Sequence, residues 1–383
     1  MNKIIYLDAA ASALKTDAVI AAEVDFLQYK YANAGRGVCA RVSAVDDMVA
    51  RTRADVAKFI NAKCDENIVF TGGTTDAMNR IARLIDDAFS VDGDSIKNKT
   101  IMVSDLDHHS ARLPFECIVG RRGCKIVLCP VNAENNLDYS NVARADVFVI
   151  TAMSNVFGGR QDVARLVAAA REKNPDVITV VDAAQYVVHE NIDVEKWDCD
   201  FMCFSAHKIG GDTGLGVMYV KNPDYWMSPD KFGGGMVARI TGAAPDNQCR
   251  IQWEPAPARF EAGTLPLTQI AGLGAAIKEW TPRCGADVMR RIRQGLDSMP
   301  RVKIYTAPDA AILTFSVDGI HPLDFGAMCG ARGLCMRVGN MCASWAMRMI
   351  DAPTGGVARL SAGPWNTIED ADRALEIIGE VIK

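Results

Sequence analysis

The chain has 383 residues, of which 49% are hydrophobic and 23% charged, a composition typical of globular proteins at a length that exceeds one compact core. Its net charge of −5 argues against a nucleic-acid partner, and its apolar runs are shorter than the roughly 20 residues of a membrane span. At this length we expect two domains. Because an acid follows as early as Asp8, we expect no secretory signal, and hence a cytoplasmic protein without membrane contact.

The twelve cysteines do not indicate disulfides or metal. Cytosolic thiols stay reduced, no two cysteines form a Cys-x-x-Cys pair, and the histidines do not fall at zinc-ligand spacing. We therefore interpret most of them, such as Cys129 and Cys203, as small buried apolar residues and predict no metal site.

The first elements in the chain alternate between strand and helix. A short strand near Leu7 leads to a helix over 17–31, a glycine-containing loop over 33–37 around Arg36, and a helix capped by Ser43 that runs to about residue 61. Further strands are predicted at 67–70, 100–103, 125–128, 146–150, 177–181 and 200–204, with helices ending near 88, 120 and 173. This alternation predicts an α/β fold with a mainly parallel sheet and ligand groups at strand carboxyl ends.

The pattern changes in the last third of the chain. Residues 222–259 predict a long ordered loop or a hairpin, a frequent place for lids and interfaces. Helices at about 266 onward, 285–299, 322–332 and 367–382, with strands at 303–305, 312–315, 334–337 and 357–360, predict a smaller α+β unit. We expect a large domain of residues 14–265 and a small domain formed by 1–13 and 266–383.

Two residues that follow neighbouring strands carry the strongest chemical hypothesis. Lys208 lies on a glycine-flanked turn after Ser205 and His207, and Asp182 ends the preceding strand. A lysine that forms a Schiff base and an acid that holds a ring nitrogen protonated are the minimum that a pyridoxal-phosphate enzyme needs. Taken alone, Lys208 could be a surface charge and Asp182 a helix cap.

The turn Thr71–Asp76 is a candidate phosphate site. A strand, two glycines, the hydroxyls of Thr74 and Thr75 and a helix start expose backbone amides to an anion. An ordinary turn capped by Thr74 fits the same residues equally well. His108, which also follows a strand, could lie against a cofactor ring or could be a structural histidine, while His109 is expected to begin a helix and face elsewhere.

Cys342 and Arg359 are candidates for the substrate side. Cys342 precedes a short predicted helix, and a thiol near a helix start can act as a nucleophile, although a buried apolar cysteine is the simpler interpretation. Arg359 interrupts an apolar strand, so we expect it to face a carboxylate from a substrate or from the protein itself. Asn155 belongs to a polar pair after another strand end.

In order along nearly the whole chain, these motifs resemble those of a known family. They include Tyr6–Ser12, Thr71–Asn79, Asp107–Ser110, Ser154–Gly158, Val181–Gln185, Cys199–Gly216, Arg259–Thr264, Arg337–Cys342 and Arg359. The chain resembles the fold-type I, class V aminotransferase-like proteins, and most closely the group II cysteine desulfurases and selenocysteine lyases.

The resemblance implies a homodimer that binds pyridoxal 5′-phosphate and transfers sulfur from L-cysteine to an acceptor protein, as in iron–sulfur cluster assembly. Lys208 would hold the cofactor covalently, Asp182 and Gln185 would contact its ring, and His108 would stack on it. The phosphate would be held by Thr74, Thr75, Ser205 and His207, with Thr264 from the partner subunit. Asn155, Arg359 and Arg36 would bind substrate, and Cys342 would take up the sulfur as a persulfide.

Several positions on the substrate side depart from the family pattern. Asn340 and Met341 stand where histidine is usual, Gly35 and Cys39 flank Arg36 where histidines are common, and residues 159–162 lack a usual threonine and proline. These departures keep two alternatives open. One is a related lyase or epimerase that acts on another amino acid, such as selenocysteine, and the other is a non-catalytic scaffold for sulfur transfer.

Overall fold

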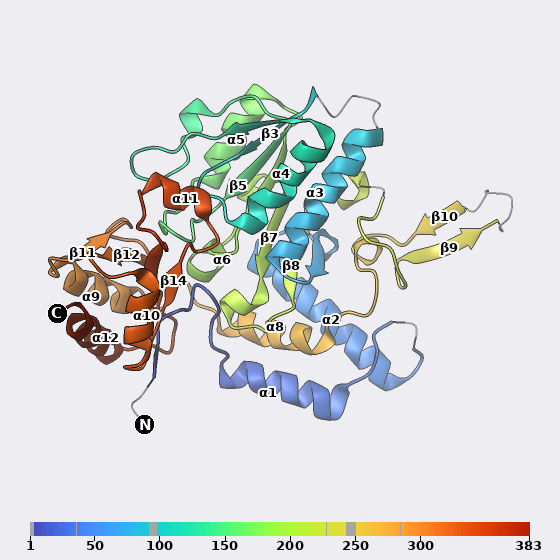
Figure 1. Ribbon diagram of the computed structural model, residues 1–383. Helices are drawn as coiled ribbons and strands as arrows, with labels where there is room; N and C mark the ends of the chain where they lie inside the picture. The colour runs from blue at the N-terminus through green and yellow to red at the C-terminus, as the bar shows by residue number, and fades with distance from the viewer. Residues whose placement is uncertain (1–3, 36, 92–97, 227, 243–249, 284) are drawn as a thin grey trace.

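The computed structural model describes residues 4–35, 37–91, 98–226, 228–242, 250–283 and 285–383. Its centre is a seven-stranded sheet in the order β2-β8-β7-β6-β5-β3-β4 (Figure 1). Parallel pairing joins the strands β7, β6, β5, β3 and β4. Strand β8 is antiparallel to both of its neighbours, β2 and β7. The bounds are β2 Ile68–Thr71, β3 Thr100–Val103, β4 Lys125–Leu128, β5 Val147–Thr151, β6 Ile178–Asp182, β7 Phe201–Ser205 and β8 Gly216–Val220. This confirms the predicted α/β fold with a mainly parallel sheet.

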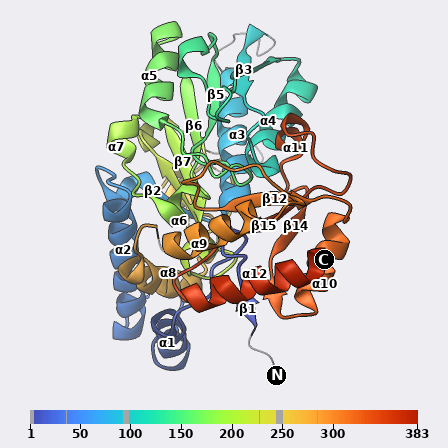
Figure 2. The same cartoon turned by 90° about the vertical axis from the view of Figure 1, so that its left-hand side faces the viewer.

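Helices cover both faces of this sheet, which explains why its central strands are apolar throughout. Along β7, Phe201 and Cys203 face one core, and Met202 and Phe204 face the other. The first core is closed by α3 (Thr74–Val91) and α4 (His109–Arg122). The second is closed by helices seen on the opposite side in Figure 2, namely α2 (Ala40–Phe59), α5 (Val163–Lys173), α6 (Tyr186–His189), α7 (Val194–Trp197) and α8 (Leu267–Glu279).

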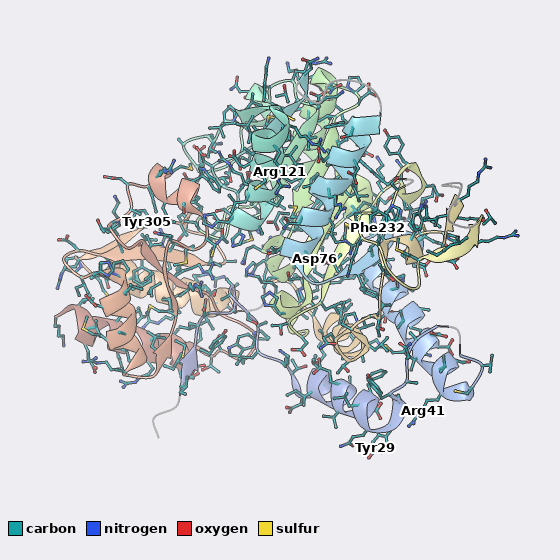
Figure 3. All side chains as sticks on the ribbon, turned by 45° about the vertical axis from the view of Figure 1, so that its right-hand side comes forward. Tyr29, Arg41, Asp76, Arg121, Phe232 and Tyr305 are labelled. Atoms are coloured by element: carbon teal, nitrogen blue, oxygen red, sulfur yellow. The ribbon has the colours of Figure 1, made fainter. Side chains whose placement is uncertain are left out.

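A second, smaller unit contains an antiparallel sheet of order β11-β12-β15-β14 with helices packed on it. Its strands are β11 Val302–Ile304, β12 Leu313–Val317, β14 Arg337–Gly339 and β15 Val357–Leu360, and its helices are α9 Ala286–Asp297, α10 Pro322–Gly330, α11 Ser344–Met349 and α12 Ile368–Ile382. The N-terminal strand β1 (Ile5–Tyr6) pairs in parallel with β13 (Leu334–Cys335), so the start of the chain joins this unit. Tyr305 on the small unit and Arg121 on α4 mark the two parts in Figure 3.

The domain boundaries stay a prediction, and the packing of α8 suggests a change to them. This helix packs against α1 (Asp17–Asp25) and α2, and its residues Leu267, Ile270 and Leu273 belong to the same core as the large sheet. Because a domain boundary should cross few contacts, we propose that the large domain extends past residue 265 to the end of α8.

Two other sequence expectations can be compared with the structure. The predicted cap Ser43 is wrong, since α2 already begins at Ala40, after the extended residue Cys39, and the Ser43 hydroxyl bonds back to the Cys39 carbonyl at 3.5 Å. The segment 222–259 contains an antiparallel hairpin, β9 (Val237–Thr241) and β10 (Arg250–Trp253), which extends away from the body (Figure 1). At its base, Phe232 lies 6.0 Å from Trp253, ring to ring (Figure 3).

No helix in the described ranges is long and apolar enough to cross a membrane. Within those ranges, no three His, Cys, Asp or Glu side chains come together as a metal site would require.

Candidate active site

The carboxyl ends of the central strands meet the small unit at a cavity of about 260 Å³. The predicted residues that line it are Thr74, Thr75, His108, Asn155, Asp182, Gln185, Ser205, His207, Lys208, Cys342 and Arg359. These residues come from at least seven separate stretches of the chain. Their roles toward a ligand stay predictions, but the fold brings their side chains to one place.

Lys208 is presented to this cavity by a short 3₁₀ turn, Ala206–Ile209, that follows β7. Gly210 ends the turn in the left-handed conformation at φ 91°, which glycine adopts without steric cost. The Lys208 amine donates a hydrogen bond of 2.6 Å to the carbonyl oxygen of Ala10. The residue is half-buried, and its amine lies at the wall of the cavity.

The surroundings of Lys208 lower its pKa to about 8. Burial is the main cause, because it disfavours the charged ammonium, and the nearby guanidinium of Arg359 acts in the same direction. The carboxylates of Asp182 and Asp8 oppose this shift. A substantial share of neutral amine near pH 8 is what a lysine nucleophile needs.

The start of α3 forms one end of the cavity and is arranged to hold an anion. The Thr74 amide donates to the Ser205 hydroxyl at 2.8 Å, and the two hydroxyls lie 2.8 Å apart. A Cβ on Gly216 would lie 2.5 Å from the Gly73 Cα, so only glycine lets the turn approach β8 this closely. The first amides of this 18-residue helix have no earlier turn to bond to, and its first two residues, Thr74 and Thr75, line this corner.

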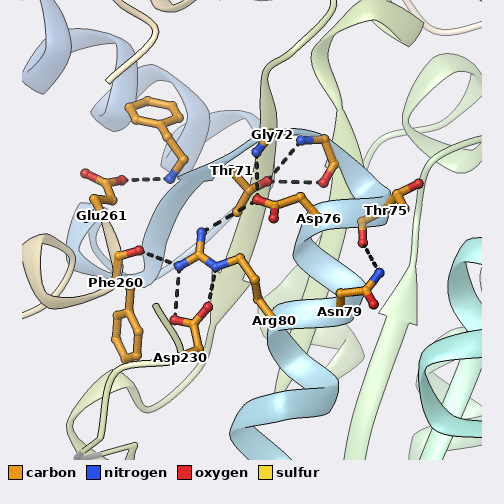
Figure 4. A network of polar contacts seen from close by, with 11 residues as sticks. Thr71, Gly72, Thr75, Asp76, Asn79, Arg80, Asp230, Phe260 and Glu261 are labelled. Atoms are coloured by element: carbon orange, nitrogen blue, oxygen red, sulfur yellow. Dashed lines mark hydrogen bonds and ion pairs between the residues drawn. The ribbon is translucent and has the colours of Figure 1, made fainter. Parts of the chain in front are cut away.

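Buried charged groups also brace the elements on either side of this turn, and Figure 4 shows the contacts of Arg80 among them. Arg80 on α3 pairs with Asp230 and donates to the Phe260 carbonyl, and all of these groups are buried. Glu261 accepts from the Phe70 amide at 2.7 Å and forms a two-point ion pair with Arg53. Asp230, Phe260 and Glu261 are therefore fastened by buried charged groups to α3 and β2, the two elements that this turn connects.

Asp182 and Gln185 form the floor of the cavity at the end of β6. Asp182 is buried, accepts from the Ala184 amide at 2.9 Å, and has a pKa raised by burial, although the nearby Lys208 ammonium moderates the rise. Gln185 donates to the Ala10 carbonyl at 2.8 Å, while its own side-chain oxygen has no partner among the described residues. In the described part of the chain no cation is in direct contact with this buried acid, which suits a positively charged ring nitrogen.

His108 lies beside the cavity as the N-cap of α4. Its Nδ1 accepts from the Ser110 amide at 3.1 Å and lies 2.7 Å from the Ser110 hydroxyl. Burial and, to a lesser degree, the Lys208 charge lower its pKa to about 4, so the imidazole is neutral near pH 7. His207, held by the Ser12 hydroxyl at 3.2 Å, is neutral for the same main reason, with a pKa of about 4.

Arg359 supplies the cavity with a buried positive charge. Its guanidinium donates to the Asn155 carbonyl at 3.0 Å and pairs with Asp8 at 3.3 Å, and its Nε has no partner in the described part of the chain. The expected carboxylate is thus at least partly the protein's own Asp8. The Nε–H without a partner is available to a carboxylate of a ligand.

Several residues that line this cavity were not predicted as site residues, among them Arg337, Met153 and Thr151. Arg337 lies on β14, directly opposite Arg359 on β15. A second arginine in a short strand could have been noticed in the sequence. Its position beside Arg359 depends on strand register, which local patterns do not specify.

Cys342 is exposed and lines the same cavity as Lys208. It follows β14 in a turn where Met341 and Cys342 have φ of 53° and 52°. The Met341 side chain is buried and also lines the cavity. Met341 is one of the two positions where the family resemblance leads us to expect a histidine.

Two predicted site residues are not among those that line this cavity. Thr264 is exposed and lines a different cavity with Asn33, Gly35 and Glu261, consistent with the expectation that it would serve a partner subunit. That expectation stays a prediction. Arg36 lies outside the described residues.

Comparison with known proteins agrees with this geometry. The family model "Aminotransferase class-V" matches residues 5–374. The chain is 34% identical to a cysteine desulfurase of Enterobacter sp. (strain 638) and 32% identical to one of Escherichia coli O127:H6, each over 96% of this chain and 91% of the relative.

Solved structures lead to the same family. An apo cysteine desulfurase from Thermococcus onnurineus NA1 superposes with a TM-score of 0.90, and a cysteine desulfurase from Escherichia coli, solved with an S-sulfonic acid, with 0.86. Both are 28% identical, and each match covers 99% of this chain and 94% of the other. The fold and the family expected from the sequence motifs are thereby confirmed.

Proposed function

The chain belongs to the aminotransferase class-V family, and we propose that it is a cysteine desulfurase that uses pyridoxal 5′-phosphate. The observation that carries this proposal is that Lys208 and Cys342 line one cavity. The start of α3, with Thr74 and Thr75, and the buried Arg359 line the same cavity. In the proposed reaction L-cysteine becomes L-alanine and its sulfur becomes a persulfide on Cys342. One C–S bond breaks and one S–S bond forms, so no external oxidant or reductant is needed.

The residues present fit this cofactor. Thr74, Thr75, Ser205 and His207 would hold the phosphate, because hydroxyls and helix amides converge there. Asp182 would pair with the ring nitrogen, Gln185 would exchange its bond to Ala10 for one to the ring oxygen, and Lys208 would leave Ala10 to attach the cofactor. When bound, the cofactor supplies an electron sink that weakens bonds next to the amino group of a substrate.

The protein's own groups would then divide the remaining tasks. Arg359, with Arg337 beside it, binds the substrate carboxylate. The Lys208 amine, neutral in part near pH 8, attaches the cofactor and can carry a proton at its Nζ. Neutral His108 covers the cofactor ring without adding charge. Cys342, at the exposed edge of the cavity, attacks the substrate sulfur and remains accessible to an acceptor protein.

A homodimer is part of the same proposal. Thr264 lies in a separate cavity of its own chain and would complete the phosphate site only in a second copy. We propose a cytoplasmic location on the same family grounds.

The direct test is incubation of the purified protein with L-cysteine and pyridoxal phosphate. We expect a yellow protein, alanine as product, a borohydride-stable adduct on Lys208 and a mass increase of one sulfur atom on Cys342. The Cys342→Ala variant should bind the cofactor but form no persulfide, whereas Cys117→Ala, which removes another exposed thiol on α4, should behave as the wild type. Unchanged alanine formation by Cys342→Ala would refute the role of Cys342.

A second candidate is a lyase for a different amino acid, such as selenocysteine. The buried Met341 beside Cys342 favours it, because an apolar thioether replaces an acid–base group at the cavity wall. A panel of amino acids decides between the two: turnover of another substrate with no alanine from cysteine would replace our first proposal. A colourless protein that takes up no pyridoxal phosphate would instead favour the sulfur-transfer scaffold.

A further inference from the structure

The turn that carries Cys342 has a backbone that its own sequence does not favour. Met341 and Cys342, two successive non-glycine residues, have φ of 53° and 52°, in the left-handed region. Each such residue costs about 1–2 kcal/mol relative to the usual conformations. A turn of this kind persists only when surrounding groups hold it in place.

Three hydrogen bonds from the large domain hold this turn on both sides of the thiol. The Asn155 side chain donates to the Met341 carbonyl at 2.7 Å, and the His109 amide donates to the Cys342 carbonyl at 2.8 Å. The Ser344 amide donates in turn to the His109 Nε2 at 3.2 Å. His109 therefore contacts the turn twice, once through its backbone and once through its ring.

The ring of His109 is itself fixed by its neighbours. It packs edge-to-face on Trp345 with centroids 5.4 Å apart, and the Ser344 hydroxyl lies 3.1 Å from its Nε2. The Arg112 guanidinium covers Trp345 at 4.1 Å and is anchored by Asp105 and Glu116. Because its Nε2 accepts from the Ser344 amide, the ring is neutral. Burial also lowers the pKa of His109, which favours the same neutral form.

We propose that His109 is a positioning residue that holds the Cys342 thiol over the cavity of Lys208. His109 is not among the cavity-lining residues, so it acts through the turn and not on a ligand. Its neighbour His108 lines the cavity, and the first turn of α4 thus links the ligand site to the thiol. This role rests on the proposed function of Cys342, but the geometry of the turn can be tested without it.

The test compares two substitutions that differ in one property. His109→Gln keeps a hydrogen-bond acceptor within reach of the Ser344 amide, and His109→Phe keeps the edge-to-face ring but removes the acceptor. Hydrogen exchange of the 340–345 amides and the alkylation rate of Cys342 by iodoacetamide are measured without substrate. Persulfide formation from cysteine and the cofactor absorbance are measured on the loaded protein.

In His109→Phe we expect faster exchange and altered alkylation, with persulfide formation reduced about 10- to 100-fold, as for a lost acceptor of a partly buried amide. The cofactor absorbance and the KM for cysteine should change less than about twofold, since the groups that hold the cofactor and Arg359, which binds the substrate carboxylate, do not contact His109. His109→Gln should recover most of the loss. If His109→Phe does not fold, His109→Asn, which is too short to reach Ser344, takes its place.

Wild-type exchange and persulfide formation in His109→Phe would overturn the proposal, as would a His109→Gln variant that is equally impaired. If the wild-type protein forms no alanine or persulfide, the proposed function fails. The exchange and alkylation data would then still decide whether His109 positions the turn.

Discussion

Arg337 and Arg359 lie directly opposite each other on the antiparallel strands β14 and β15, and both side chains line the cavity of Lys208. Residues directly opposite in such a pair share one face of the sheet. Two guanidinium groups therefore enter the site side by side, one exposed and one buried. Only one protein carboxylate, Asp8, pairs with Arg359 in the described residues, which makes a negatively charged substrate group the natural additional partner.

This arrangement predicts unequal effects of two matched substitutions. Arg359→Lys keeps the charge but loses the planar fork, and we expect its KM for cysteine to rise roughly 10- to 150-fold, the value of one or two charged hydrogen bonds. The exposed Arg337→Lys should raise the KM about fivefold or less. Steady-state alanine formation measures both, with the surface variant Arg290→Lys on α9 as a neutral control. Equal effects at the two positions would contradict the larger role of the buried arginine.

The lowered pKa of Lys208 predicts how cofactor uptake depends on pH. Only the neutral amine can attach the cofactor, so the attachment rate to the apoprotein should rise with pH and level off above about pH 8. Arg359→Gln removes a positive charge that lowers this pKa, and should move the midpoint to higher pH. Stopped-flow absorbance at a series of pH values gives both curves. A rate that still rises steeply above pH 10 would mean that Lys208 behaves as an ordinary lysine.

The close contact between Gly216 and Gly73 predicts that the phosphate corner tolerates no side chain there. In Gly216→Ala the new Cβ would lie 2.5 Å from the Gly73 Cα, so the turn must move. Overpacking of this kind costs about 1–3 kcal/mol, and we expect the affinity for pyridoxal phosphate to fall roughly 5- to 150-fold. Spectrophotometric titration measures it. Gly120→Ala on α4, where a Cβ meets nothing within 4 Å, is the matched control and should bind as the wild type does.

The ion pair of Arg80 and Asp230 predicts a strong effect on stability. The exposed fractions of their side chains are 8% and 0%, so Asp230→Ala leaves a buried guanidinium without its partner. We expect a loss of about 3–5 kcal/mol in the free energy of unfolding of the large domain, measured by denaturant titration. Asp287→Ala, which removes the exposed partner of Arg290, should cost less than about 1 kcal/mol. A similar shift in both variants would show that burial of the pair does not matter.

Much of the site could be recognised from local sequence because its chemistry follows directly on strand ends. Lys208 after β7, Asp182 at the end of β6 and Thr74 at the start of α3 each stand next to an apolar run and a turn residue. A parallel sheet brings all such ends to one edge, so local patterns were enough to predict that these residues meet.

The small-unit side of the cavity could not be worked out in this way. Asp8 and Arg359 are 351 positions apart and pair only because the N-terminal segment joins the small unit. Likewise, the start of α2 was misplaced because Ser43 is a good cap by type, whereas the extended backbone of Cys39 decides where the helix begins.

Local patterns in the chain were enough to predict the fold class, the family and the groups of a cofactor site, because these depend on periodicity, turn chemistry and ordered motifs. Three relationships appear only in the folded chain: Arg337 stands beside Arg359, Thr264 lies away from the cavity of Lys208, and His109 bonds to the turn of Cys342. Those relationships arise from strand register and from packing between distant segments. Register and packing are properties of the whole folded chain, and no short stretch of sequence contains them.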